Sequence, residues 1–213
     1  EGRRYCYGNQ PHIAQWNLAR LAEALLPVVP DQKPLEDALT LYADTFNAGW
    51  QKALAAKLGV PALDRQEDDA LVKDLLELFR RAETDFTLFF RNLARVAGPI
   101  DPLLPAFYSE PDATTRQAWE DWLKRYLERA KDIPAAERRS RMDRVNPKYV
   151  FRNYLAQLAI DAIEQRDDTS VLERLMRVLE RPYDEQPEHE DLAARRPEWA
   201  RHRAGCSALS CSS

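Results

Sequence analysis

The sequence predicts an all-α protein, and three observations support that prediction. Apolar side chains recur at spacings of three and four residues, which places them on one face of a helix. The 213 residues include 14 Pro and only 6 Gly, and the prolines stand between the amphipathic stretches, where they start or stop helices. So few glycines argue against a β-sandwich or a glycine-rich phosphate loop, because both depend on turns with positive φ.

The first two expected helices flank the proline-rich turn 27–34. Pro11 suits the first turn of the first helix. Its apolar face comprises Ile13, Trp16, Leu18, Leu21 and Leu25. Gly59 is suited to cap the second helix, and Pro61 prevents its continuation. The apolar face of this second helix comprises Leu35, Leu39, Tyr42, Phe46, Trp50 and Leu54.

Six further helices are expected downstream. Asp64 and Glu67 have the spacing of a capping box before the first of them, and Ser170 and Glu173 have the same spacing before the last. The stretch 100–112 contains prolines and is expected to be a loop. The expected helices cover 68–82, 84–98, 114–132, 135–146, 148–167 and 171–182.

Large apolar side chains at helical spacing mark the expected core. In 114–132 they are Trp119, Trp122, Leu123 and Tyr126. The most apolar helix, 148–167, has a stripe of Val150, Phe151, Tyr154, Leu155, Leu158, Ala159, Ala162 and Ile163. After Pro182 the chain is polar and poorly periodic, so we expect it to wrap the surface rather than build core. The expected organisation is a helical part, 1–182, followed by an irregular tail, 183–213.

Composition excludes several classes of function. The net charge of −4 gives no reason to expect a nucleic-acid partner, and no apolar run approaches the ~18 residues that cross a membrane. The chain begins without Met or a signal-peptide segment, so the start is expected to be a cut. Three widely placed cysteines do not make a secreted disulfide framework. We therefore expect a cytoplasmic protein.

The titratable side chains outline no active site. His12, His189 and His202 lie far apart, and none has a second ligand at the spacing of a helical metal motif. The carboxylate clusters 67–70 and 165–170 sit at helix starts, where capping and the helix dipole explain them. No G-x-S-x-G elbow, P-loop or dinucleotide fingerprint occurs. The sequence thus assigns no catalytic, cofactor-binding or metal residue within this chain.

The stretch 137–152 is locally basic. Its basic residues are Arg138, Arg139, Arg141, Arg144, Lys148 and Arg152. It could bind phosphate or nucleic acid, but a solvated or salt-bridged helix face is the commoner explanation. An RNA platform needs exposed aromatic residues among the charges, whereas Tyr149, Phe151 and Tyr154 follow the core stripe.

The ending GCSALSCSS places Cys206 and Cys211 five residues apart in a stretch of small residues, where packing does not require a thiol. A thiol near a chain terminus can reach a distant cysteine, and an exposed thiolate is reactive. The sequence indicates a redox role for this ending. An incidental free thiol and a Cys206–Cys211 pair remain alternatives.

Three segments resemble the SelO family, also called YdiU. They are RYCYGNQPHIAQWNLARLAEALLP (4–27), the stretch 146–187 with NPKYVFRNYLAQ and RPYDEQP, and the ending SCSS (210–213). The stretch DFTLFFRNLA (85–94) is compatible with the same family. The resemblance runs from near the first residue to the last.

The resemblance implies a fold and an activity. SelO proteins are pseudokinases with a protein-kinase-like fold, which transfer AMP from ATP to hydroxyl side chains of proteins with a bound divalent metal. Their ATP-binding and metal-binding residues, including the Asp of a DYG motif, precede the segment matched by 4–27, and no DYG occurs here. This chain would be the helical C-lobe portion, with 1–11 ending the activation segment.

The family also implies a role for the last cysteine. Some members form a disulfide between a C-terminal Cys and a Cys of the activation loop, which restrains the enzyme under oxidation. Cys211 matches the terminal position, and the usual partner would precede Glu1. Cys206 and Cys6 are possible alternatives that the family does not match.

The expected function is the C-terminal part of an AMP-transferring enzyme, inactive by itself. Its partners would be the missing N-terminal catalytic half and the protein substrates, with neither nucleic acid nor membrane. ATP and Mg²⁺ or Mn²⁺ would bind the full-length protein, and this fragment alone would bind none of them. The alternative is a non-catalytic helical interaction module.

Overall fold

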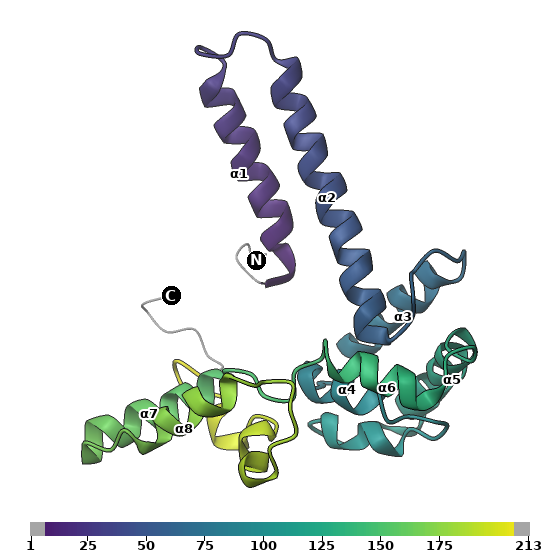
Figure 1. The fold of residues 1–213 in the computed structure, drawn as a ribbon, viewed down its shortest axis with the longest axis vertical. Helices are drawn as coiled ribbons and strands as arrows, with labels where there is room; N and C mark the ends of the chain where they lie inside the picture. Colours follow the sequence, from purple (N-terminus) through teal and green to yellow (C-terminus); the bar gives the residue numbers. More distant parts are fainter. Residues whose placement is uncertain (1–6, 207–213) are drawn as a thin grey trace. The chain divides into compact units, whose positions relative to one another are not determined.

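The computed structural model describes residues 7–206, and this range is all-α, as the sequence predicts (Figure 1). Within the range no β-sheet forms. One isolated antiparallel bridge joins Thr84 to Phe107. The chain divides into two compact units, Glu1–Leu54 and Ala55–Ser213.

The first unit is a helical hairpin. A short 3₁₀ turn, η1 (Tyr7–Asn9), leads into α1 (Gln10–Leu25), and α2 (Lys33–Leu58) returns and continues into the second unit. The Tyr42 hydroxyl donates a hydrogen bond of 3.0 Å to the Pro11 carbonyl, so the two helices meet near the start of α1. Both expected helices are confirmed, yet none of the residues of α1 is buried.

The end of α2 is confirmed as a glycine cap. Gly59 adopts φ +70°, a left-handed conformation that strains other residues. A Cβ atom at this position would lie 2.7 Å from Cγ of Met142 and 2.8 Å from Cγ of Arg138. Glycine is therefore required at this position both by the backbone conformation and by the space available.

Five helical elements form the first core of the second unit. They are α3 (Asp68–Arg81), α4 (Phe86–Leu93), the 3₁₀ helix η2 (Asp101–Ala106), α5 (Ala113–Arg129) and α6 (Ala135–Asp143). α3 packs against α5, and α4 packs against η2 and α6. The expected apolar face of α5 is confirmed, because Trp119, Trp122 and Tyr126 are fully buried. Trp122 donates to the Leu71 carbonyl (2.9 Å) and the Tyr126 hydroxyl to the Leu58 carbonyl (2.9 Å), whereas the ring N–H of Trp119 has no hydrogen-bond partner within the described range.

A second core lies between α7 (Asn153–Arg166), α8 (Ser170–Leu179), η3 (Pro187–Ala193) and η4 (Glu198–Ala200). The helix expected from residue 148 begins five residues later, at Asn153. The amides of Lys148 and Tyr149 donate instead to the Pro182 carbonyl, at 2.8 and 3.1 Å. The backbone of Arg152 is extended (ψ 141°), so α7 does not reach back to these residues. Phe151 is 58% exposed rather than part of a core stripe.

The segment after Pro182 differs from the expectation that it would not build core. Leu192, Ala193, Ala200 and Cys206 are buried and join the second core. The reason is geometric: α7 and α8 pair with each other, and the face they leave bare is covered by the short 3₁₀ turns. The boundary drawn after Pro182 stays a prediction.

The expected capping boxes are wrong in detail. α3 begins at Asp68, and Glu67 makes no capping bond. The Asp68 carboxylate itself accepts from the Arg65 amide (3.0 Å). At α8 the Thr169 hydroxyl, one residue before the expected cap, donates to the Glu173 carboxylate (2.8 Å). The expected loop 100–112 contains η2, because Pro102 and Pro105 are both compatible with a 3₁₀ helix.

Candidate functional site

A buried arginine on α4 joins the segments that carry the family resemblance. The Arg91 side chain is 5% exposed. Its guanidinium donates to the carbonyls of Asp143 (2.8 Å) and Asn146 (3.0 Å). On the other side it donates to the carbonyl of Tyr183 (3.0 Å) and the carboxylate of Glu185 (2.9 Å). One side chain thus ties α4 to the end of α6 and to the segment RPYDEQP. We call this the Arg91 junction.

Glu185 is the carboxylate at the centre of the Arg91 junction. It accepts from Arg91, from Arg95 (3.1 Å) and from Lys148 (2.6 Å). Burial raises the pKa of Glu185, but the hydrogen bonds from Lys148 and Arg91 outweigh that effect and lower the pKa to about 2. Burial lowers the pKa of Lys148, yet its bonds to Glu185 and Glu190 leave it raised. Both groups are therefore charged at neutral pH, and neither is suited to proton transfer.

The rest of RPYDEQP is held by hydrogen bonds as well. Gln186 is 3% exposed, and its amide nitrogen donates to the carbonyls of Val178 (3.1 Å) and Arg181 (2.9 Å). The Tyr149 hydroxyl donates to the Gln186 carbonyl (2.8 Å). Burial is the main cause that raises the pKa of Tyr149, so its hydroxyl stays protonated. The motif functions here as a rigid connection between α8 and η3.

A second buried ion pair reinforces α4 at its first turn. Asp85 is the N-cap of α4, and its carboxylate accepts from the Leu88 amide (3.0 Å). Arg152 donates to both oxygens of the same carboxylate. Because Arg152 immediately precedes α7, this pair links the start of α4 to the start of α7. A bidentate arginine–carboxylate pair gives directional as well as electrostatic stabilisation.

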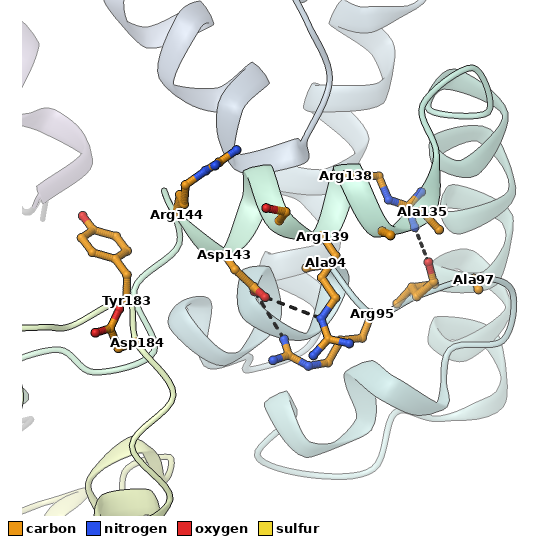
Figure 2. A pocket seen from close by; sticks show the side chains of 13 residues that line it. Ala94, Arg95, Ala97, Ala135, Arg138, Arg139, Asp143, Arg144, Tyr183 and Asp184 are labelled. Carbon is orange, nitrogen blue, oxygen red and sulfur yellow. Dashed lines mark hydrogen bonds and ion pairs between the residues drawn. The ribbon is translucent and has the colours of Figure 1, made fainter.

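A shallow pocket of about 660 Å³ borders the Arg91 junction, because Asp143 and Tyr183 line it. Figure 2 shows the side chains around this pocket. Asp143 lies between Arg95 and Arg139 and pairs with both, each at 3.6 Å. Arg138, at the other end, donates to the Val96 carbonyl. Arg144 also lines the pocket and has no ion-pair partner among residues 7–206. Four arginines and two aspartates line the pocket, so it keeps a net positive charge although Asp143 pairs with two of the arginines.

The salt-bridged interpretation of the basic stretch 137–152 is confirmed for most of its residues. Arg139 pairs with Asp143, Arg141 with Glu137, Lys148 with Glu185 and Glu190, and Arg152 with Asp85. Arg138 is buried over the ring of Tyr126. The assignment of its aromatic residues to the core is confirmed for Tyr149 and Tyr154, which are buried, and wrong for Phe151.

His12 belongs to the first unit, and His189 and His202 belong to the second. His189 accepts a hydrogen bond from Arg174 (3.1 Å), and the same guanidinium pairs with Asp191. Arg174 therefore holds His189 and Asp191 together. Within the part of the chain that the structure describes, no three His, Cys, Asp or Glu side chains are placed to hold a metal ion.

Of the three cysteines, Cys206 lies inside the described range. It is 7% exposed and packs in the second core beside Leu192 and Ala200. The candidate redox residue Cys211 and the alternative Cys6 lie outside the described residues. The absence of a packing role, inferred from the small-residue sequence, is wrong for Cys206.

Sequence reasoning missed the two residues that organise the junction, Arg91 and Glu185. A signal for Arg91 was present, because it is one charged residue within the apolar run FFRNLA, and a charge in a buried helix needs partners. Glu185 stands in a polar segment and carries no such signal. Its role depends on Arg91 and Lys148, which are distant in sequence.

The fold and the site together define the class of the chain: an all-helical region in which buried arginine–carboxylate contacts join helices that are distant in sequence. Among residues 7–206, no helix combines the length and the apolar character that crossing a lipid bilayer requires. The family described as "Protein adenylyltransferase SelO" matches residues 1–180, and the chain belongs to this family.

Several curated relatives are similar over the whole chain. A "Protein nucleotidyltransferase YdiU" of Nitrosospira multiformis is 50% identical, and this chain covers 43% of it. A protein of the same description from Aromatoleum aromaticum is 53% identical, with 41% of it covered. One from Rhodopirellula baltica is 48% identical, with 43% covered. The chain thus spans less than half the length of the curated relatives it matches.

Proposed function

We propose that this chain is the helical C-terminal part of a SelO-type pseudokinase that transfers AMP from ATP to Ser, Thr or Tyr hydroxyls of other proteins. The observation that carries the proposal is identity near 50% over the entire chain to proteins described as nucleotidyltransferases. The family match over residues 1–180 supports it. The kinase-like C-lobe and the AMP chemistry follow from the family resemblance.

In this proposal the chain supplies structure rather than chemistry. ATP and Mg²⁺ or Mn²⁺ bind in the part of the relatives that this chain does not span. The carboxylates of the Arg91 junction do not fit a metal site, because Asp143 and Glu185 are engaged by arginine and lysine side chains. The Arg91 junction holds α4, the end of α6 and the segment RPYDEQP together. In this proposal that arrangement supports the surface that contacts the catalytic half and the protein substrates.

The test is AMP transfer from ATP labelled at the α-phosphate, with Mg²⁺ or Mn²⁺ present. The longer polypeptide, extended at the N-terminus as the relatives are, should label a protein acceptor. The 213-residue chain should not. Labelling by the 213-residue chain would contradict the placement of the catalytic residues, and failure of the longer polypeptide under all metal conditions would contradict the activity.

The redox role of the C-terminus is a further part of the proposal. Cys211 is assigned as the regulatory thiol, with its partner in the preceding catalytic half and Cys206 or Cys6 as alternatives. In the longer polypeptide, Cys211→Ser should make AMP transfer insensitive to mild oxidation. Inhibition by oxidant that persists in this variant would assign the role to another cysteine. The cytoplasmic location also remains a proposal.

The alternative function, a non-catalytic helical interaction module, has one observation in its favour. The hairpin exposes large apolar side chains, among them Leu21 and Trp50, as docking surfaces do. Stable binding of another protein by the 213-residue chain, together with a longer polypeptide that transfers no AMP, would favour this alternative.

A further inference from the structure

The helical hairpin of the first unit has apolar faces but almost no interior. None of the 16 residues of α1 is buried. From Lys33 to Ala53, α2 contributes no buried residue either, and burial begins at Leu54. Helices in proteins owe most of their stability to the packing of an apolar face. A hairpin that leaves both faces exposed therefore needs a surface to pack against.

Two exposed aromatic side chains of α2 lie on one face of the helix. Phe46 is 38% exposed and Trp50, one turn further, is 46% exposed. They continue the line of Leu35, Leu39 and Tyr42, which are partly shielded. The ring of Phe46 stacks with that of Tyr42, with centroids 6.5 Å apart. These five apolar residues, at spacings of three and four, thus form one stripe, which we call the α2 stripe.

Helix α1 of the hairpin also exposes apolar side chains. Leu18 and Leu25 are each 37% exposed, and Leu21 is 55% exposed. These positions are three and four residues apart, so they share one face of α1. Contiguous exposed apolar surface of this kind marks an interaction site in a soluble protein.

The relatives indicate what covers these faces. They align over all of this chain, hairpin included, at identities of 48–53%. The hairpin is therefore an ordinary part of the family's chain and not an addition peculiar to this sequence. This chain covers 43% of the first relative, so more than half of the polypeptide of that relative lies outside it and is available as a covalently linked partner.

We propose that the α2 stripe is an intramolecular docking surface, which binds the part of the longer polypeptide that this chain does not span. The inference rests on the proposed function, because it assumes the longer polypeptide. A covalently linked partner binds at high effective concentration, so a modest apolar stripe is sufficient. Trp50 is expected to be its main anchor, because aromatic side chains dominate such interfaces.

Thiol labelling with a matched pair of positions tests this. Leu41 is 67% exposed and lies nine residues before Trp50, which at about 100° per residue puts it on the opposite side of α2. Trp50→Cys and Leu41→Cys would each be placed in a background with Cys6 and Cys211 changed to Ser and Cys206 to Ala. Maleimide labelling would be followed by mass spectrometry, in the longer polypeptide and in the 213-residue chain.

In the longer polypeptide, position 50 should react at least about tenfold more slowly than position 41, because a packed interface excludes the reagent. In the 213-residue chain both positions should react rapidly. Equal rates in the longer polypeptide would overturn the inference. Protection of position 50 in the 213-residue chain would also overturn it, since the cover would then be this chain itself or a second copy.

Two controls keep the result interpretable. If Trp50→Cys fails to fold, as judged by circular dichroism, Phe46→Cys reports on the same stripe. AMP transfer by the longer Leu41→Cys protein is measured in parallel. If the protein is active and position 50 labels as fast as position 41, the docking surface is refuted and the proposed function stands. If the protein is inactive and position 50 is protected, the proposed function is refuted and the docking surface stands.

Discussion

Arg91 shows how a single residue can organise a helical protein. A guanidinium stays charged at any physiological pH and carries five donors in a fixed plane. Buried among apolar side chains, it would be very costly without partners. Here its two terminal nitrogens donate to three carbonyls and the Glu185 carboxylate, and its Nε makes an ion pair of 3.4 Å with Asp143 but no hydrogen bond among the described residues. The charge is thus converted into directional bonds that select one arrangement of α4, α6 and RPYDEQP.

Replacing Arg91 tests that role. Arg91→Ala should lower the free energy of unfolding by about 3–5 kcal/mol, because it removes a buried partner of Glu185 and leaves three carbonyls without their donor. The measurement is urea unfolding followed by circular dichroism. Arg139→Ala is the control, since Arg139 is 53% exposed and pairs with Asp143 within one helix. It should change stability by no more than about 0.5 kcal/mol, and similar losses in both variants would refute the junction.

The Glu185 carboxylate should make the stability of the folded protein depend on pH. Its pKa is about 2 in the folded protein against a model-compound value of 4.5, so the folded state favours the carboxylate. The stability it contributes is present above pH 4.5 and is lost as the pH falls toward 2. The unfolding free energy of wild type should therefore exceed that of Glu185→Gln by about 1 kcal/mol near neutral pH. The difference is small because solvent screens a half-exposed ion pair.

The measurement for Glu185 is the unfolding free energy of wild type and Glu185→Gln across the acid range. The difference between the two proteins should shrink as the pH falls below 4.5. A difference that stays constant over this range would show that the charge of Glu185 does not contribute to the stability of the folded protein. Half of the Glu185 side chain is exposed, so the variant is expected to fold.

At the scale of helices, some helix ends follow local sequence signals and others do not. The glycine that ends α2 is a local signal, and the structure confirms it. The start of α7 does not follow the local apolar pattern: the Arg152 backbone is extended, and the amides of Lys148 and Tyr149 bond to the Pro182 carbonyl. That carbonyl is 33 or more residues away in the sequence.

The end of α2 supports a prediction with an internal control. Gly59→Ala should destabilise the protein by about 2–4 kcal/mol, the sum of a left-handed alanine and a Cβ forced against Met142 and Arg138. Gly49→Ala lies within the same helix, where a Cβ would meet nothing within 4 Å. It should stabilise α2 by about 0.5–1 kcal/mol, because alanine loses less backbone entropy than glycine.

Thermal unfolding followed by circular dichroism distinguishes the two glycines. The melting temperature should fall clearly for Gly59→Ala and should rise or stay unchanged for Gly49→Ala. If both substitutions lowered the melting temperature to the same extent, the positive φ of Gly59 and its crowded site would not be the cause.

At the scale of the whole molecule, burial is unequal between the two units. The second unit contains fully buried Phe89, Trp119 and Tyr126, whereas α1 buries no residue. Local stability follows buried apolar contacts. We therefore expect the two units to differ in how readily they open.

Hydrogen exchange of the 213-residue chain should show this difference. Amides of α1 (Gln10–Leu25) should exchange much faster than those of α5 (Ala113–Arg129), whose apolar face is buried. Mass spectrometry of peptic fragments gives both rates in one experiment. Equally slow exchange in α1 would mean that the hairpin already has a packed partner in this chain.

The sequence by itself determined the helical class, the approximate span of the helices and the aromatic core of α5, because these depend on composition and on the 3.6-residue period. It also indicated the family, through NPKYVFRNYLAQ and RPYDEQP. Only the tertiary structure decided that Arg91, Asn146 and Glu185 meet, that α7 begins at Asn153, and that Leu192 and Cys206 are core. Those outcomes depend on hydrogen bonds and packing between residues far apart in sequence, which no local pattern encodes.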